Sequence, residues 1–420
     1  MTAPTRLERN LTGILDDLSA GPTPDYLDDL FVRTGRMRQR PAWTFPERWL
    51  PMSDITRPRA FAFAPPWRTI ALVLVVVALI VVAAFAYVGS QRRVPAPFGP
   101  AANGLIVYHN GGDIYTGDPI TGEERLVVGG KDYDSKPGFS PDGTLIAFLR
   151  QSGSDVDLFT VRPDGTDLKR VTAASLPESS WINWAPDSRH FGVVHLVDGH
   201  NRFDLLSLDG QPPRRLAGDM DVESSSYRPP AAREIMFRAV VDGKFGLFVM
   251  DADGTNVRTL VEPTLDVEVD QNLNAATYSV DGSRIFYQRW FPESIQLWVM
   301  NPDGTDQHRF DTQVAPAWSG QPAVSPDGRW VAYWHVFQDG RATQRVSVAR
   351  ADGTGPLVQT GPELKGGANF FWAPDSSKIL MTTGDAADSP GHYLLDPVGG
   401  PWTKTAWPAI SYPDWQRLAP

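Results

Sequence analysis

An uninterrupted apolar run over residues 70–88 dominates the hydrophobic pattern near the N-terminus. Its nineteen residues carry no charge, and the nearest charged side chains are those of Arg68 and Arg92. At the rise of an α-helix this length matches the hydrocarbon core of a bilayer, which takes about 20 residues. Backbone groups in lipid must satisfy their own hydrogen bonds, so we expect a helix despite the many valines. The pattern therefore predicts a transmembrane helix over residues 69–90.

Two other interpretations of this run remain open. A buried core helix or strand would also be apolar, although the length and the arginine flanks favour the bilayer. A cleaved signal peptide is the other, since Ala84-Phe85-Ala86 is similar to a cleavage site, but the preceding 68 residues are too long for a signal peptide.

Charge predicts the orientation of the chain. Residues 1–68 hold ten arginines and eight acidic side chains, a net +2, whereas residues 89–420 hold 29 basic and 41 acidic side chains, a net −12. Eight of those arginines lie between residues 30 and 68, next to the apolar run. Positively charged segments that flank a membrane helix remain in the cytoplasm. We therefore expect a single-pass protein of the cell membrane, with a cytoplasmic N-terminus and an extracytoplasmic C-terminal domain.

We expect the N-terminal 68 residues to form a short cytoplasmic tail. Leu7, Leu11 and Leu18 give one amphipathic helix its apolar stripe, and Thr23-Pro24-Asp25 predicts the start of a second. These helices either pack loosely on each other or dock on a cytoplasmic regulator. The segment that follows, to residue 68, combines arginine, proline and aromatic residues, which suits an anionic membrane surface or a disordered linker. The residues expected at the lipid surface are Arg57, Arg59, Trp67 and Arg68.

After a proline-rich spacer over residues 91–103, a periodic pattern of short β-rich runs fills residues 104–420. One recurring unit is an apolar residue, a Pro-Asp-Gly-type turn and a β-rich run, as in residues 139–148 and 324–333. A second unit follows each first one, as in residues 247–254 and 297–304. Aspartate followed by glycine or serine between such runs predicts a hairpin. Each period of about 45 residues thus contains four short strands, which is typical of a β-propeller.

The two ends of this region complement each other. Residues 104–128 supply the second, third and fourth strands of a repeat but lack the first strand. Ile410–Trp415 is similar to a first strand that is not followed by the other three. Counting the third strand of each repeat, near residues 114, 158, 205, 247, 297, 346 and 393, predicts seven blades. The fold class is therefore all-β: a seven-bladed propeller closed by a blade split between the N- and C-terminal ends of the domain.

The Ser-Pro-Asp-Gly repeats, each followed by a Leu-Phe/Trp-Val-Met-Asp/Asn-x-Asp-Gly unit, resemble the TolB-like branch of WD40-like propellers. The resemblance covers about residues 104–418 and implies the propeller fold. Periplasmic TolB itself is soluble, with a separate N-terminal α/β domain and six blades, so no role in outer-membrane integrity is carried over.

The sequence offers little catalytic or metal-binding chemistry. It has no cysteine, no Gly-x-Ser-x-Gly pentapeptide and no His-Glu-x-x-His motif, so we predict no enzyme, cofactor or metal. His190, His195 and His200 are five residues apart and need not converge. Asp251-Ala-Asp-Gly254 resembles part of a calcium loop, but turn chemistry alone explains it. Trp184 and Trp372 are expected to pack between blades rather than to bind sugars.

Acidic residues gather in the connections that lead into the first strand of each repeat. In a propeller these connections emerge on one face, so the sequence predicts an acidic rim around the channel mouth. A cationic ligand, a basic peptide or a metal could use this rim, whereas solubility of an acidic domain explains it without any ligand. The residues are Asp132, Asp134, Glu178, Asp219, Asp221, Glu223, Asp266, Glu268 and Asp270.

Three functions fit this sequence. We favour a non-catalytic scaffold that holds a protein or cell-envelope ligand at the propeller face. The alternative is a signalling receptor whose tail binds a regulator, a layout similar to membrane anti-sigma factors, although the cysteine-dependent zinc motif of many such factors is missing. A propeller lyase or hydrolase is the third. The acidic domain argues against a nucleic-acid partner.

Overall fold

The computed structural model describes residues 67–90 and 94–419, except for 173–174, 178–179, 267–275, 292–293, 312–317, 338–342, 367, 384–390, 406 and 408–409. The predicted tail helices and the arginines at positions 57 and 59 lie outside the described residues. The chain divides into two compact units at residues 90 and 91.

The apolar run forms the helix α3, Trp67–Ser90, whose limits lie within two residues of the prediction. Its described side chains are those of residues 70–81, and they are largely exposed. Leu72 and Leu74, for example, have 65% and 63% of their surface exposed to solvent. Among the residues whose side chains are described, no helix is both long enough and apolar enough to cross a bilayer.

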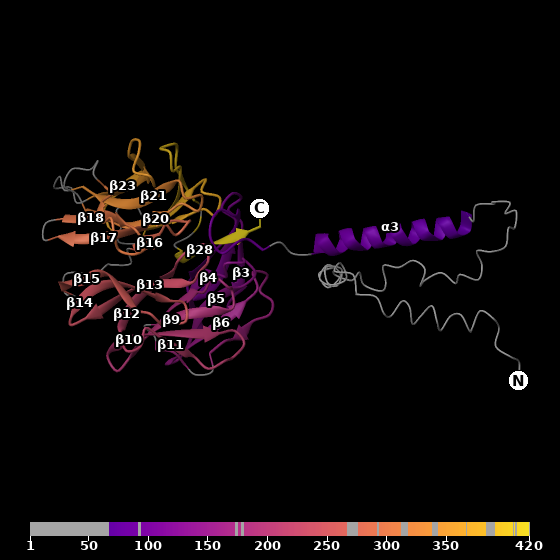
Figure 1. Ribbon diagram of the computed structural model, residues 1–420, viewed down its shortest axis with the longest axis horizontal. Coiled ribbons are helices and arrows are strands. Elements are labelled where there is room, and N and C mark those ends of the chain that lie inside the picture. Colours follow the sequence, from indigo (N-terminus) through magenta and orange to yellow (C-terminus); the bar gives the residue numbers. More distant parts are fainter. Residues whose placement is uncertain are drawn as a thin grey trace, which may run out of the picture. The chain divides into compact units, whose positions relative to one another are not determined.

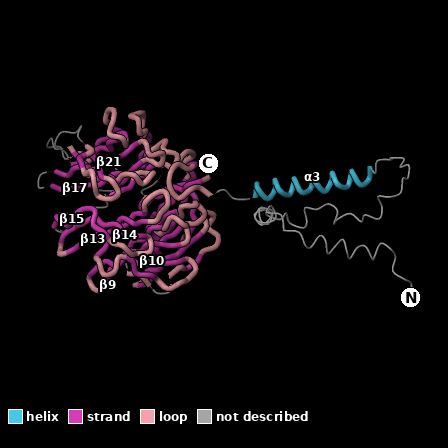
Figure 2. The backbone as a smooth tube through the Cα atoms, in the orientation of Figure 1, coloured by secondary structure: helices cyan, strands magenta, loops and turns pink. Residues whose placement is uncertain are grey.

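All described regular structure from residue 94 onward is β-strand, as Figure 2 shows. The strands form seven four-stranded antiparallel sheets, so the predicted seven-bladed all-β propeller is confirmed. Blades 1 to 3 are built from β4 Tyr133–Phe139, β5 Ile146–Ser152, β6 Asp155–Val161 and β7 Lys169–Arg170; β8 Trp181–Trp184, β9 His190–Val197, β10 His200–Ser207 and β11 Arg214–Leu216; β12 Asp221–Tyr227, β13 Glu234–Val241, β14 Lys244–Asp251 and β15 Arg258–Asp266.

Blades 4 to 6 follow the same order along the chain. They are built from β16 Ala276–Tyr278, β17 Ile285–Phe291, β18 Ser294–Met300 and β19 His308–Arg309; β20 Trp318–Val324, β21 Trp330–Val336, β22 Gln344–Arg350 and β23 Val358–Leu364; β24 Ala368–Trp372, β25 Ile379–Thr383, β26 His392–Leu395 and β27 Thr403–Lys404.

The seventh sheet is the split blade. Its order is β28-β1-β2-β3, with β1 Ala102–Asn110, β2 Asp113–Gly117, β3 Glu124–Val128 and β28 Ser411–Leu418. The strand β28 pairs with β1 antiparallel, and Ile106 lies opposite Trp415. In Figure 1 the yellow C-terminal strand accordingly lies beside the indigo strands from the beginning of the domain. The predicted closure of the ring is therefore confirmed.

Seven buried apolar clusters join the blades into a closed ring. Each cluster combines the facing sides of two neighbouring blades, as where Val346 of blade 5 and Ile379 of blade 6 share one cluster. Another joins Ile106 of the split blade to Leu380 of blade 6. A four-stranded sheet has two apolar faces, and only its two neighbours can cover both of them.

The turns of the repeat are built by their own polar side chains. In blade 1, the hydroxyl of Ser140 donates to Asp142 at 2.6 Å, and the same carboxylate accepts from the backbone of Thr144 at 3.0 Å. The indole of Trp184 donates across the blade boundary to the carbonyl of Gly138 at 3.1 Å, and Trp372 does the same to a carbonyl of blade 5. Both tryptophans thus pack between blades, as the sequence indicates.

The proline-rich segment before β1 is tied to the propeller along part of its length. The guanidinium of Arg417 donates to the carbonyls of Ala96 and Gly99, at 3.0 and 2.6 Å. The backbone nitrogen of Ala101 donates to the carbonyl of Pro374 at 3.0 Å. The segment from residue 96 onward therefore belongs to the folded domain, which begins earlier than the predicted position 104.

Candidate functional site

The first strand of every blade is innermost: it lies at one edge of its sheet, and first strands contact one another across several blade boundaries, as β28 and β4 do. All of them begin on one face of the propeller, which also carries the hairpins between second and third strands. We call this the start face and the other the opposite face. Loops on a rigid scaffold are common places for binding sites, so the start face is the candidate site.

The structure places the predicted rim residue Asp134 inside the protein rather than on the start face. It is the second residue of β4, its side chain is 1% exposed, and it accepts two bonds from Arg150, at 2.7 and 2.8 Å. Burial raises the pKa of this carboxyl and outweighs the lowering effect of Arg150. The Asp134 side chain therefore links β4 to β5 through Arg150, and it is not exposed to a ligand.

Two other predicted rim residues join blade 2 to blade 3. Asp221 accepts a bond from the backbone nitrogen of Asn201 at 2.7 Å, and Glu223 accepts from the side-chain amide of Asn201 at 2.9 Å. Asp221 also lies 3.3 Å from the ring of His200. These carboxylates reach the start face, but part of their hydrogen-bonding capacity serves the boundary between blades.

The remaining acidic positions form no common cluster that the structure describes. Asp132 lies in the connection before β4 and is partly exposed, and the carbonyl of Asp219 accepts a bond from Arg202. Asp266 ends β15, and its side chain lies outside the described part of the chain, as do three whole residues, Glu178, Glu268 and Asp270. The side chains of Trp67 and Arg68, at the start of α3, also lie outside it.

The histidines singled out by the sequence lie apart from one another. His190 faces Asp187 at 2.6 Å, and His195 faces Asp204 at 2.7 Å. Asp253, in the segment similar to a calcium loop, instead accepts two bonds from Thr255, at 2.9 and 2.6 Å. In the part of the chain that the structure describes, no three histidine or acidic side chains gather as a metal ion would need.

Exposed aromatic residues begin several innermost strands, a feature that the sequence analysis did not identify. Tyr133, Trp181 and Trp318 are the first residues of β4, β8 and β20, and Tyr412 is the second of β28. Each of these four side chains has between 43% and 50% of its surface exposed to solvent. Aromatic side chains with a polar edge are enriched where proteins bind partners. Their repeated position at the strand start was the signal available in the sequence.

Three blades contribute to one aromatic cluster on this face. The ring of Tyr412 lies 5.9 Å from Trp181 and 5.6 Å from His109, and His109 lies 6.1 Å from Tyr133. Burial lowers the pKa of His109, so it is neutral at physiological pH. The ammonium group of Lys136 stands 4.3 Å above the Trp181 ring. The cluster is therefore an aromatic surface that carries one positive charge.

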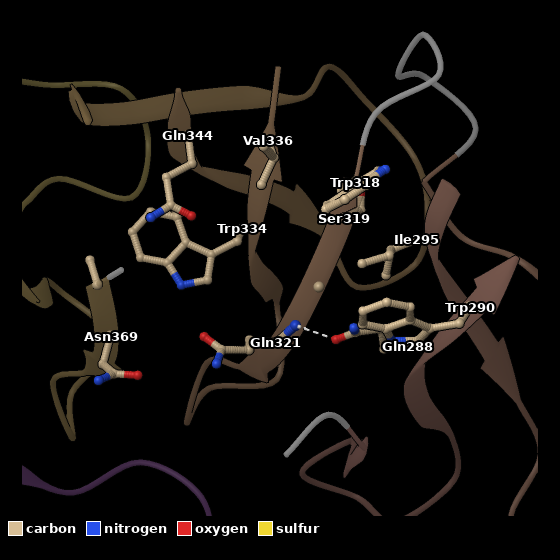
Figure 3. Close-up of a pocket in the computed structure, with 12 residues that line it drawn as sticks. Gln288, Trp290, Ile295, Trp318, Ser319, Gln321, Trp334, Val336, Gln344 and Asn369 are labelled. Carbon is tan, nitrogen blue, oxygen red and sulfur yellow. Dashed lines mark hydrogen bonds between the residues drawn. The ribbon is translucent and has the colours of Figure 1, made fainter. Parts of the chain in front are cut away.

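A pocket of about 340 Å³ opens on the start face between blades 4, 5 and 6 (Figure 3). This volume is at the lower end of the range for small-molecule sites. None of the lining residues that the structure describes carries a charge: Gln288, Trp290, Ile295, Trp318, Ser319, Gly320, Gln321, Trp334, Val336, Gln344, Ala368 and Asn369.

The innermost strand of blade 5 shapes one wall of this pocket. Its pairing with β21 shifts register between Gly320 and Ala323, and Gln321 adopts a left-handed backbone with φ 52°. Such a bulge turns a side chain out of the regular alternation of a strand. The backbone nitrogen of Gln321 donates to the side-chain oxygen of Gln288 at 3.2 Å, which links blade 5 to blade 4. Figure 3 draws this bond at the centre of the pocket.

No protein-family model matches this chain. Among proteins of known sequence, the chain is 28% identical over 183 residues to a protein of Agrobacterium fabrum that is itself described only as uncharacterized. The match spans 43% of this chain and 48% of that protein, so the chain covers about half the length of this relative.

Solved structures of similar fold include a prolyl endopeptidase, with a TM-score of 0.55, 13% identity, and coverage of 75% of this chain and 50% of that one. The oligogalacturonate lyase of Vibrio parahaemolyticus has a TM-score of 0.53, 12% identity, and coverage of 72% and 86%. TolB from Acinetobacter baumannii has a TM-score of 0.45, 15% identity, and coverage of 77% and 68%. At these identities the first two matches show the propeller fold alone.

Proposed function

We propose that this chain is a non-catalytic binding module that α3 anchors in the cell membrane, with its propeller outside the cytoplasm and its start face holding a protein or cell-envelope ligand. The observation that carries the proposal is the gathering, on this one face, of the uncharged pocket and the exposed aromatic residues. Single exposed apolar side chains are normal, but exposed apolar groups that gather in one region commonly mark an interface.

The chemistry of the pocket supports a binding role rather than a catalytic one. Its described lining residues include no aspartate, glutamate, histidine, lysine or tyrosine, which are common general acids and bases. Ser319 carries the hydroxyl in this set, and among the described residues no base lines the pocket to activate it as a nucleophile. The fold itself does not decide the function, since one fold hosts many chemistries.

The composition of α3 supports the anchor. Its 24 residues include Arg68 as the single charged side chain, and the described ones point large apolar groups outward. Lipid is the environment in which such a surface is stable. The arginine-rich tail on one side and the acidic propeller on the other support the orientation.

A photo-crosslinking amino acid tests the binding face. We expect crosslinks in cells from position 181 or 318, which begin innermost strands on the start face. Position 168 is the matched control, because Leu168 is comparably exposed at 44% but lies in the turn between β6 and β7 on the opposite face. Equal crosslinking from both faces, or none from the start face, would contradict the proposal.

A further inference from the structure

We infer that the pocket between blades 4, 5 and 6 binds an uncharged, polyhydroxylated ring, that is, a neutral sugar residue of a glycan. This inference rests on the proposed function and names the ligand class for part of the start face. It follows from three features of the pocket: buried polar groups without partners, amides held in fixed orientations, and the absence of charge among the lining side chains that the structure describes.

Buried polar groups at the pocket have no partner within the protein. The indole nitrogens of Trp334 and Trp290 and the hydroxyl of Ser319 are inaccessible to solvent and make no hydrogen bond among the described residues. Trp334 is 5% exposed and Ser319 is fully buried. Figure 3 shows the Trp334 ring with its nitrogen on the side of Gln321 and Asn369. Unpaired buried donors are uncommon in folded proteins, so each of these groups points to an acceptor supplied from outside.

Two amides of the pocket are already oriented by the protein. The oxygen of Gln288 accepts the bond from the Gln321 backbone, which leaves its nitrogen as a donor. The nitrogen of Gln344 donates to the carbonyl of Gly366, which leaves its oxygen as an acceptor. A hydroxyl group both donates and accepts, so adjacent hydroxyls on one ring match donors and acceptors that stand side by side.

The lining excludes other ligand classes. A phosphate, a carboxylate or a metal ion is bound most strongly by a charged partner, and none of the lining residues in the described part of the chain supplies one. The indoles of Trp290, Trp318 and Trp334 offer flat apolar surfaces, which suit the C–H faces of a sugar ring. A volume of about 340 Å³ corresponds to about ten water molecules and accommodates a single ring rather than an extended peptide.

Titration of the full-length chain with neutral disaccharides tests the inference. The probes are maltose, cellobiose and the disaccharide of N-acetylglucosamine, with digalacturonate as the charged counterpart and a detergent that has no sugar head group. We expect a neutral disaccharide to change the tryptophan fluorescence and to bind at least tenfold more tightly than digalacturonate. Trp334→Phe keeps an aromatic ring but removes the indole N–H donor. The affinity for the neutral disaccharide should therefore fall about fivefold while the protein stays folded.

The matched control is Trp402→Ala, which removes a tryptophan that is 44% exposed between β26 and β27 on the opposite face and should leave sugar affinity unchanged. Gln344→Leu provides a second test, because it removes the acceptor and should weaken binding as Trp334→Phe does. Binding of none of the neutral sugars, unchanged affinity in both pocket variants, or a preference for digalacturonate would overturn the inference. If start-face crosslinks persist while sugars fail to bind, the proposed function stands and only the ligand class is wrong.

Discussion

Asp132 and Asp134 are two residues apart in the sequence, but they have different environments. Asp134 is enclosed and accepts two bonds from Arg150, whose guanidinium also lies 4.9 Å from the Phe159 ring. Asp132 is partly exposed at the start face. Removing one partner of a buried pair leaves the other charge without compensation, which destabilises the fold.

Asp134→Ala should therefore lower the free energy of unfolding by about 2 to 3 kcal/mol, less than the full effect of a buried pair because Arg150 retains some contact with water. Asp132→Ala, the matched control, should change it by less than about 0.5 kcal/mol. Urea unfolding followed by tryptophan fluorescence measures both. Equal effects of the two substitutions would show that Asp134 has no special structural role.

The carboxyl group of Asp414 is enclosed where β28 meets blade 1. It accepts a bond from the backbone nitrogen of Phe139 at 2.7 Å. Burial raises the pKa of Asp414 to about 6, although backbone donors and Arg417 act to lower it. The folded protein thus binds a proton that the unfolded chain releases near pH 4, so stability must fall as the pH rises through this interval.

We predict that the contribution of Asp414 to the stability of the wild-type protein falls, on the order of 3 kcal/mol, as the pH rises from about 4 to about 6.5. Asp414→Asn stays neutral and can still accept the bond from Phe139, so its stability should not show this loss. Because the pKa values of His109 and His335 are lowered, these two residues change stability in the opposite direction as the pH rises. The measurement is therefore the difference between the variant and the wild type at each pH. A constant difference across this range would contradict the prediction.

At the scale of the strand, the contact between β28 and the first turn of blade 1 holds the ring closed. Gly143 lies in that turn with φ 70°, and a Cβ atom there would lie 2.2 Å from the backbone oxygen of Arg417. The side chain of Gln416 donates to the carbonyl of Gly143 at 2.8 Å. Only glycine lets the two backbones approach this closely.

Gly143→Ala should consequently destabilise the propeller by at least about 2 kcal/mol more than Gly153→Ala. Gly153 is the matched control because its φ of 67° is nearly the same, whereas a Cβ atom there would meet nothing within 4 Å. The comparison cancels the backbone strain that both substitutions share. Similar unfolding free energies for the two variants would mean that β28 adapts to the added methyl group.

The repeated strands explain why the fold could be predicted from the sequence and the pocket could not. Turn residues such as Pro141 and Asp142 recur at a fixed spacing, so strands and blades follow from local patterns. The pocket instead combines Gln288, Trp334 and Asn369, which belong to three blades and share no motif. The acidic rim was likewise inferred from loop position alone, and the burial of Asp134 depends on its pairing with a neighbouring strand.

At the scale of the whole molecule, the lack of cysteine makes the proposed topology directly testable. Ile120→Cys places a single thiol at a position that is 91% exposed on the propeller, and Ser19→Cys places one in the tail. In intact cells or spheroplasts, a membrane-impermeant maleimide should label the first variant, and label the second only after lysis. The reverse pattern would contradict the orientation, and labelling of both would contradict an anchored chain.

A charge in α3 provides a second test of the anchor. Leu79 is 62% exposed in the helix, and lysine at the centre of a spanning helix costs about 2.5 to 3.5 kcal/mol. Leu79→Lys should therefore reduce the membrane-bound fraction, whereas Leu79→Ala, the matched control, should not. An unchanged fraction in the lysine variant would argue against insertion.

The split blade also has a consequence for how the protein is made. Trp415 donates a hydrogen bond to the carbonyl of Gly104, 311 positions away, so the partner of β1 leaves the ribosome long after β1 itself. At about 5 to 20 residues per second, β1 exists for roughly 15 to 60 seconds before that partner is synthesised. Throughout this interval one edge of the nascent domain is open to other chains and to proteases. The cell must therefore protect an incomplete circle until β28 has been synthesised, and chains that stop before β28 should be degraded rather than nearly functional.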